Sequence, residues 1–341
     1  MTCTSATRRR LLQAGVAAPF ATSMIIRDAN SQTAIPVTIA HALKLANYGP
    51  VFVAQRQGLF EKQGLNVSIE VAGSIAEPVA IALSGRAQIA TTGTGMSVNS
   101  TLEGGRMKCV AKMCGALGLW VITRPETAFK SLDDFKGKKV ASFRFPSNTV
   151  TSPTFAMRKY GNFDPQAAGV QFIEGPFGSI VPAVKDGRAD VGVVFEWDAS
   201  VAATQHGLNV SYGLAEQIGP ILFTAVMVKE DYIKTNPDVI QRYCNAIAGA
   251  MKMIRENKAA YVNAMAAEFN NLPRPTVEAG CDRLLATRGF VPTNPIISKV
   301  EWDAIMEHET VAKTVRKAMT FEEMVDNRFA EKAAAEFGLR S

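Results

Sequence analysis

The sequence has few of the residues from which catalytic and metal sites are usually built. Its three histidines, His41, His206 and His308, lie far apart in the chain. It contains no Cys-x-x-Cys pair, and no histidine cluster accompanies the cysteines. These absences argue against a metal site and against a Ser-His-Asp or Cys-His nucleophilic centre. We therefore expect no enzyme activity, no metal and no cofactor.

The five cysteines also argue against a disulfide framework. Cys3 lies in an N-terminal segment that is discussed below. If Cys109 and Cys114 share one strand, they are too far apart to bridge, because five extended residues span about 16 Å. Cys244 and Cys281 fall in helical patterns and could meet. Four buried free thiols are nevertheless the better interpretation of the remaining cysteines.

Strong charge of one sign is absent as well. The chain has 37 Lys and Arg against 31 Asp and Glu, a net charge of +6. Removal of residues 1–34 would take away four arginines and Asp28, which leaves +3. No basic patch with interleaved aromatic residues occurs, so we expect no nucleic acid as a partner.

Residues 1–34 differ from the rest and resemble an export signal. A basic start, Thr-Arg-Arg-Arg-Leu-Leu-Gln at 7–13, precedes the apolar run Ala14–Ile26 and several small residues. This run is shorter than the ~20 residues that a membrane span needs. Arg8 and Arg9 with the leucines behind them resemble the twin-arginine type. We expect the segment to be removed and the protein to reside in the periplasm.

The 341 residues suggest roughly two domains, and one sequence unit occurs twice. Ser-Gly-Arg-Ala-Gln-Ile-Ala at 84–90 is matched by Asp-Gly-Arg-Ala-Asp-Val-Gly at 186–192. Each copy indicates a helix, a glycine stop at Gly85 or Gly187, and a buried strand. A polar loop, Thr92–Gly95, is expected after the first strand. Two copies suit two similar α/β lobes.

Strands and helices alternate over the first two thirds of the chain, which indicates parallel or mixed sheets. Helical periodicity occurs at 51–57, 75–83, 150–160 and 178–184, and almost throughout from Pro237. The expected strands are Val37–Ala42, Asn66–Val71, Gln88–Thr91, Lys108–Met113, Leu119–Thr123, Lys139–Phe143, Val170–Glu174, Val191–Phe195 and Leu222–Val228.

Four motifs follow one another along the chain: Tyr48–Ala54, Gly58–Val67, Ser84–Ala90 and Ser131–Val140. In this order they resemble one family, the nitrate/sulfonate/taurine-type periplasmic substrate-binding proteins of ABC importers, of the thiamine-pyrimidine-precursor-binding-like superfamily. The resemblance covers about Val37 to Val228.

The resemblance implies a two-lobe α/β binding protein of type II with a ligand cleft between the lobes. Lobe one would hold 37–123 plus 223–341, including the helical C-terminal part, and lobe two 124–222. We expect hinges near Thr123–Pro125 and Leu222–Ala225. It also implies a monomer that delivers its ligand to the permease and ATPase subunits of an ABC importer.

Ligands of open α/β sheets bind outside the carboxyl ends of strands. Gly73-Ser74 and Ser147–Thr149 also precede expected helices, whose free N–H groups favour an anion, although plain capping by Ser74 and Thr149 explains them too. The candidate ligand-binding residues are Asn47, Tyr48, Gly73, Ser74, Thr92, Gly93, Thr94, Leu117, Ser147, Asn148, Thr149, Phe177, Glu196 and Trp197.

The expected ligand is a small organic anion, a sulfonate or carboxylate with an apolar or aromatic body. Because no arginine occurs in these loops, we expect neutral donors to hold it. One alternative is a pyrimidine-type thiamine precursor, with Glu196 at the ring nitrogens. The other is a fold-related enzyme, but the cysteine nucleophile of the desulfinase branch and the cysteine-rich iron site of the pyrimidine synthase branch are missing.

Overall fold

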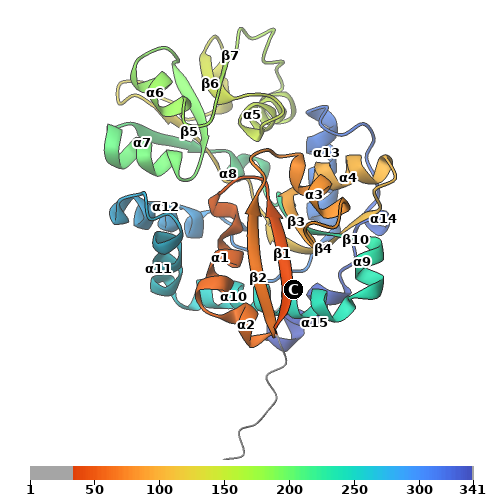
Figure 1. The fold of residues 1–341 in the computed structure, drawn as a ribbon. Helices are drawn as coiled ribbons and strands as arrows, with labels where there is room; N and C mark the ends of the chain where they lie inside the picture. Colours follow the sequence, from red (N-terminus) through yellow and green to blue (C-terminus); the bar gives the residue numbers. More distant parts are fainter. Residues whose placement is uncertain (1–33, 340–341) are drawn as a thin grey trace, which may run out of the picture. The chain divides into compact units, whose positions relative to one another are not determined.

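The computed structural model of the protein describes residues 34–339. Within this range the chain forms two five-stranded sheets with helices packed around them (Figure 1). None of the helices in this range is long and apolar enough to cross a membrane. The predicted export segment lies, except for its last residue, outside the described range. The expected two-lobe α/β fold with mixed sheets is confirmed.

The first sheet joins strands from both halves of the chain. β1 pairs in parallel with β2 and β3, whereas β10 runs antiparallel between β3 and β4. In spatial order the strands are β2 (Leu65–Val71), β1 (Ile35–His41), β3 (Ile89–Gly93), β10 (Thr224–Lys229) and β4 (Met107–Cys114).

The second sheet repeats this arrangement with one continuous stretch of chain. β6 pairs in parallel with β7 and β8, and β5 runs antiparallel between β8 and β9. In spatial order the strands are β7 (Gln171–Gly175), β6 (Lys139–Phe143), β8 (Val191–Phe195), β5 (Leu119–Thr123) and β9 (Asn209–Gly213).

Helices follow most strands. Those around the first sheet's N-terminal strands are α1 (Gly49–Arg56), α2 (Leu59–Lys62), α3 (Glu77–Leu83) and α4 (Gly95–Leu102). Those of the second sheet are α5 (Asn148–Lys159), α6 (Ile180–Lys185), α7 (Asp198–His206) and α8 (Leu214–Ile218). The C-terminal part is helical as predicted: α9 (Glu230–Thr235), α10 (Pro237–Glu256), α11 (Lys258–Glu268), α12 (Arg274–Ala286), α13 (Lys299–Val311), α14 (Phe321–Met324) and α15 (Arg328–Glu336).

The C-terminal helices complete the first sheet's core. α10 packs against α1, α2 and α15, so the orange-red N-terminal helices α1 and α2 lie beside the cyan helix α10 (Figure 1). One face of α10 is apolar, and its Tyr243 stacks on Phe60 of α2 with ring centroids 5.6 Å apart. Such a stripe at helical spacing is buried against a core. β4 extends one residue beyond the predicted strand, so Cys109 and Cys114 share it, and the four cysteines of this range are buried free thiols, as predicted.

The repeated sequence unit occupies the same place in both sheets. α3, Gly85 and β3 in the first sheet correspond to α6, Gly187 and β8 in the second. Both glycines have positive φ, +83° and +71°, a conformation that favours glycine because it has no Cβ. The predicted helix, glycine stop and buried strand are therefore confirmed in both copies.

The assignment of Leu119–Thr123 to lobe one is wrong, because this strand, β5, pairs with β8 and β9 in the second sheet. The chain therefore crosses between the sheets at 115–118, before the expected hinge at Thr123–Pro125, and returns at 219–223. The two crossings are joined by backbone hydrogen bonds, from Ile221 N–H to the Gly115 carbonyl at 3.0 Å and from Phe223 N–H to that of Cys114 at 3.1 Å.

Local boundaries also differ from the sequence prediction. The helix expected from Ile75 begins at Glu77, because Ser74–Ala76 form a bend in which Ser74 Oγ accepts a hydrogen bond from Glu77 N–H at 3.3 Å. The polar loop expected at Thr92–Gly95 is not a loop: β3 extends to Gly93 and α4 begins at Gly95.

Candidate functional site

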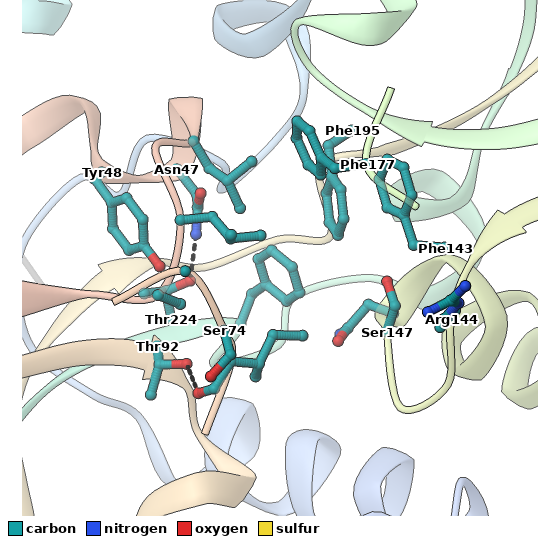
Figure 2. Close-up of a pocket in the computed structure, with 18 of the residues that line it drawn as sticks. Asn47, Tyr48, Ser74, Thr92, Phe143, Arg144, Ser147, Phe177, Phe195 and Thr224 are labelled. Carbon is teal, nitrogen blue, oxygen red and sulfur yellow. Dashed lines mark hydrogen bonds between the residues drawn. The ribbon is translucent and has the colours of Figure 1, made fainter. Parts of the chain in front are cut away.

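A cavity of about 540 Å³ lies where the carboxyl ends of parallel strands from both sheets come together (Figure 2). From the first sheet it is lined by residues that follow β1, by the end of β3 and by Thr224 at the start of β10. From the second sheet it is lined by the ends of β6, β7 and β8. Its size is typical of sites for small organic molecules.

Most of the candidate residues lie around this cavity. Those of the first sheet and its loops are Asn47, Tyr48, Gly73, Ser74, Thr92 and Gly93; those of the second are Ser147, Asn148 and Phe177. The other candidates do not line it: Thr94, Leu117, Thr149, Glu196 and Trp197.

The first sheet supplies small polar groups to the cavity. Asn47 Nδ2 donates a hydrogen bond to Thr224 Oγ1 at 2.8 Å, and Thr92 Oγ1 donates to the Ile75 carbonyl at 2.7 Å. Asn47 and Thr224 are almost fully buried. Behind them His41 stacks on the ring of Tyr48, with centroids 4.1 Å apart. This stacking fixes the ring that forms part of the wall.

The second sheet supplies an aromatic wall. The Phe143 ring stacks on Phe177 with centroids 4.8 Å apart, and Phe195 lies 6.2 Å from Phe143 (Figure 2). Phe143 and Phe195 end the neighbouring strands β6 and β8, which explains why the rings meet. Phe177 is 58% exposed, so much of its apolar surface is available for contact with a ligand.

Arg144 lines the same cavity, directly after β6. It is exposed, and its guanidinium makes no ion pair or hydrogen bond to any residue of the 34–339 range. This arginine was not among the candidates, because the candidate residues after this strand begin at Ser147. The expectation that neutral donors hold the ligand rested on loops without an arginine, and Arg144 does line the cavity.

At the start of α5 the hydroxyl groups are used for capping. Ser147 Oγ accepts a hydrogen bond from Thr149 N–H at 3.3 Å, and Thr149 Oγ1 accepts one from Phe143 N–H at 2.9 Å. Thr149 is completely buried, whereas Ser147 and Asn148 line the cavity. Thr149 thus holds β6 to α5 and has no access to the cavity.

We expect Thr149→Val to lower the free energy of unfolding by about 1–3 kcal/mol, because it leaves the buried Phe143 N–H without a partner. Urea denaturation measures this loss. Thr154→Val on the same helix is the control, since the Thr154 side chain makes no hydrogen bond to any residue of the 34–339 range. Equal stability of the two variants would contradict the assigned role of Thr149.

Thr94 and Leu117 lie in the interior rather than in the cavity. Thr94 Oγ1 donates a hydrogen bond to the Leu222 carbonyl at 2.7 Å, and both Thr94 and Leu117 are fully buried. The hydroxyl therefore links α4 to the chain that returns from the second sheet.

Glu196 and Trp197 are turned toward α12. Glu196 pairs with Arg283 and accepts hydrogen bonds from Ser200 N–H at 3.0 Å and Ser200 Oγ at 3.1 Å. Burial raises the pKa of Glu196, although Arg283 opposes the shift. Trp197 is 8% exposed and packs beside Gly280, where a Cβ would lie 2.6 Å from the indole. Both side chains thus join the second sheet to the C-terminal helices.

One serine–histidine pair, of the kind found in nucleophilic catalytic sites, lies away from the cavity. Ser152 Oγ of α5 lies 3.0 Å from His308 Nε2 of α13, and His308 Nδ1 is 3.8 Å from Glu309 Oε1. Sequence reasoning had treated the histidines as scattered. Ser152 and His308 are fully buried and neither lines the cavity, so this contact joins two helices and offers a substrate no access.

Comparison with known proteins shows the family of this chain. Residues 46–260 match the model of the family described as NMT1/THI5 like. The chain belongs to this family. The matched residues contain both copies of the repeated unit and every candidate residue of the cavity. The resemblance noted from the sequence motifs is thereby confirmed.

Individual relatives of this NMT1/THI5-like chain are distant. It is 22% identical over 309 residues to YtlA of Bacillus subtilis (strain 168), a protein with a provisional name as a binding protein, covering 89% of this chain and 92% of YtlA.

Solved structures show the same fold. The ligand-binding component of an ABC-type import system from Staphylococcus aureus, with zinc bound, has a TM-score of 0.72 at 13% identity, covering 88% of this chain and 99% of that one. The periplasmic aliphatic sulphonate binding protein SsuA from Escherichia coli has a TM-score of 0.65 at 17% identity, with 86% and 92% covered.

Proposed function

We propose that this protein is the solute-binding component of an ABC importer and that it captures a small organic anion in the cavity between its sheets. The ligand is a sulfonate or carboxylate with an apolar or aromatic body. The observation that carries the proposal is the lining itself, in which an aromatic wall and Arg144 face small neutral groups. A cavity of about 540 Å³ exceeds what an inorganic ion such as nitrate requires.

The similar proteins support the role and its cellular setting. One similar structure is a component of an ABC-type import system, and another is a periplasmic binding protein for aliphatic sulphonates. We propose accordingly that the chain is exported to the periplasm, acts there as a monomer without a cofactor, and delivers its ligand to a permease and an ATPase. It has no catalytic role in this proposal.

The proposal includes a division into two lobes that follows the sheets. Lobe one contains the first sheet and the C-terminal helices, and lobe two contains the second sheet, with the crossings at 115–118 and 219–223 as the hinge. Closure about such short connecting segments is a common response to ligand.

A pyrimidine-type thiamine precursor is the second candidate ligand class. Its expected partner, Glu196, does not line the cavity and is already bonded to Arg283 and Ser200. This arrangement favours the anion over the pyrimidine.

A thermal-shift and calorimetric screen over sulfonates, aromatic and aliphatic carboxylates and pyrimidines tests the function. A true ligand at a hundred times its dissociation constant should stabilise the protein by about 2.7 kcal/mol. Stabilisation by anions supports the proposal. Stabilisation by pyrimidines alone would replace it with the second candidate, and no stabilisation by any of these compounds would refute both.

A further inference from the structure

The two walls of the cavity differ in chemistry, so the two ends of a bound ligand would contact different groups. Asn47 and Thr224 lie on one side, and Arg144 lies with Phe143 and Phe177 on the other (Figure 2).

On the first wall, Asn47 and Thr224 retain one donor and one acceptor. Asn47 Nδ2 donates to Thr224 Oγ1. Burial raises the pKa of the Tyr48 hydroxyl, and a hydrogen bond with the Asn47 amide opposes this shift. Within residues 34–339 no hydrogen bond is donated to the amide oxygen Oδ1, and the Thr224 hydroxyl keeps its proton. A hydroxyl group has one donor and two acceptor positions. The exposed fractions of Asn47 and Thr224 are 9% and 1%. A ligand hydroxyl can accept a hydrogen bond from the Thr224 hydroxyl and donate one to Asn47 Oδ1. This buried pair therefore suits a ligand with a hydroxyl group.

On the second wall, Arg144 is the one charged residue among the described residues that line the cavity. No carboxylate lines it in this range, so nothing in the lining attracts a cation or neutralises the guanidinium. Arginine matches carboxylate and sulfonate oxygens with two parallel N–H groups. The lining therefore selects a negative charge at this end of the site.

Between the two ends the lining is apolar. The stacked rings of Phe143 and Phe177 continue toward Phe195, and Phe223 lies beside Thr224. Such surfaces favour a flat apolar body over a flexible polar one.

We propose that the ligand is an aromatic acid with two polar ends: an anionic group held by Arg144 and an uncharged hydroxyl held by Asn47 and Thr224. This proposal rests on the proposed function and specifies the substrate class of the same site. A hydroxylated aryl carboxylate or sulfonate has both groups on one rigid body.

Calorimetric titration with matched probes tests the two ends separately. We expect 4-hydroxybenzoate to bind the protein about tenfold more tightly than benzoate, because the hydroxyl satisfies Asn47 and Thr224. Thr224→Val should abolish this preference, whatever its effect on stability, since the preference is a ratio measured on one variant.

Arg144→Gln should weaken 4-hydroxybenzoate and benzoate alike by about ten- to a hundredfold and leave 4-hydroxybenzyl alcohol unchanged. Arg188→Gln is the control, because it removes the same charge from a residue that does not line the cavity. Equal weakening of the alcohol, or equal affinity for 4-hydroxybenzoate and benzoate, would overturn the proposal. If alkanesulfonates bind and none of the aromatic probes does, the two-ended ligand is wrong and the proposed function stands.

Discussion

Replacing Arg283 with alanine is expected to lower the free energy of unfolding by about 3 kcal/mol, because it leaves the carboxylate of Glu196 buried without its counter-ion. The Glu196 side chain is 1% exposed and that of Arg283 is 22% exposed. Ser200 would still donate its two hydrogen bonds. Among residues 34–339, Arg283 is the one group outside the 196–200 turn that lowers the pKa of Glu196, so this pKa should rise further without the arginine.

Urea denaturation of Arg283→Ala at pH 7 and pH 5 measures the effect. The loss should be smaller at pH 5, where protonation of the isolated carboxyl relieves the buried charge. The matched control is the double variant Glu196→Gln with Arg283→Ala, which removes both charges and should recover much of the lost stability. If the double variant is as unstable as Arg283→Ala alone, the arginine acts through packing on Trp120 rather than through charge.

The second large effect is a loss of folding stability at low pH. His41 is fully buried, and burial lowers its pKa from 6.5 to about 3. Protonation therefore favours the unfolded chain between these two values, so the stability contributed by neutral His41 is complete above pH 6.5 and is lost as the pH falls toward 3. The slope is about 1.4 kcal/mol per pH unit, which over this pKa difference sums to about 5 kcal/mol.

Comparison with His41→Asn isolates this contribution. Asparagine keeps a hydrogen-bonding group toward Thr91, the partner of His41 Nδ1, but does not titrate. A comparison of variants is needed because burial raises the pKa of Asp198 to about 6, and this opposite shift stabilises the fold as the pH falls. The parent protein should lose stability relative to His41→Asn from pH 6.5 downward. Parallel profiles would show that His41 is not responsible.

Much of the fold could be predicted from local sequence. Apolar stretches gave the places of nearly all strands, and Gly85 and Gly187 marked the two equivalent turns because a positive φ favours glycine. β9 was not predicted, since Asn209–Gly213 carries no clear apolar alternation. The sheet to which β5 belongs could not be read from the chain, because strand pairing depends on partners distant in sequence.

In the candidate site, too, residues marked by a local pattern could be predicted, whereas contacts between residues distant in sequence could not. Loops at strand ends were identified from the alternation of strands and helices, and so the polar residues around Asn47 and Ser147 were found. Glu196 and Trp197 were expected at the cavity but do not line it, and Arg283, the partner of Glu196, lies 87 residues further along the chain. No local signal indicates such a pairing. The end of β6 was predicted correctly, but Arg144, which directly follows it, was missed because the candidates of this loop begin at Ser147.

The antiparallel strand at the fourth position of each sheet has a consequence for the order in which the protein can fold. The second sheet uses one continuous segment, 119–213, and its pairings are complete once that segment has been synthesised. The first sheet must wait for β10, which inserts between β3 and β4 from more than a hundred residues away. Contacts of such separation form slowly, because the intervening chain must be ordered before they can contribute. During synthesis, β3 and β4 therefore present unpaired edges until residues 224–229 arrive, and these edges are the part of the nascent chain most in need of protection from aggregation.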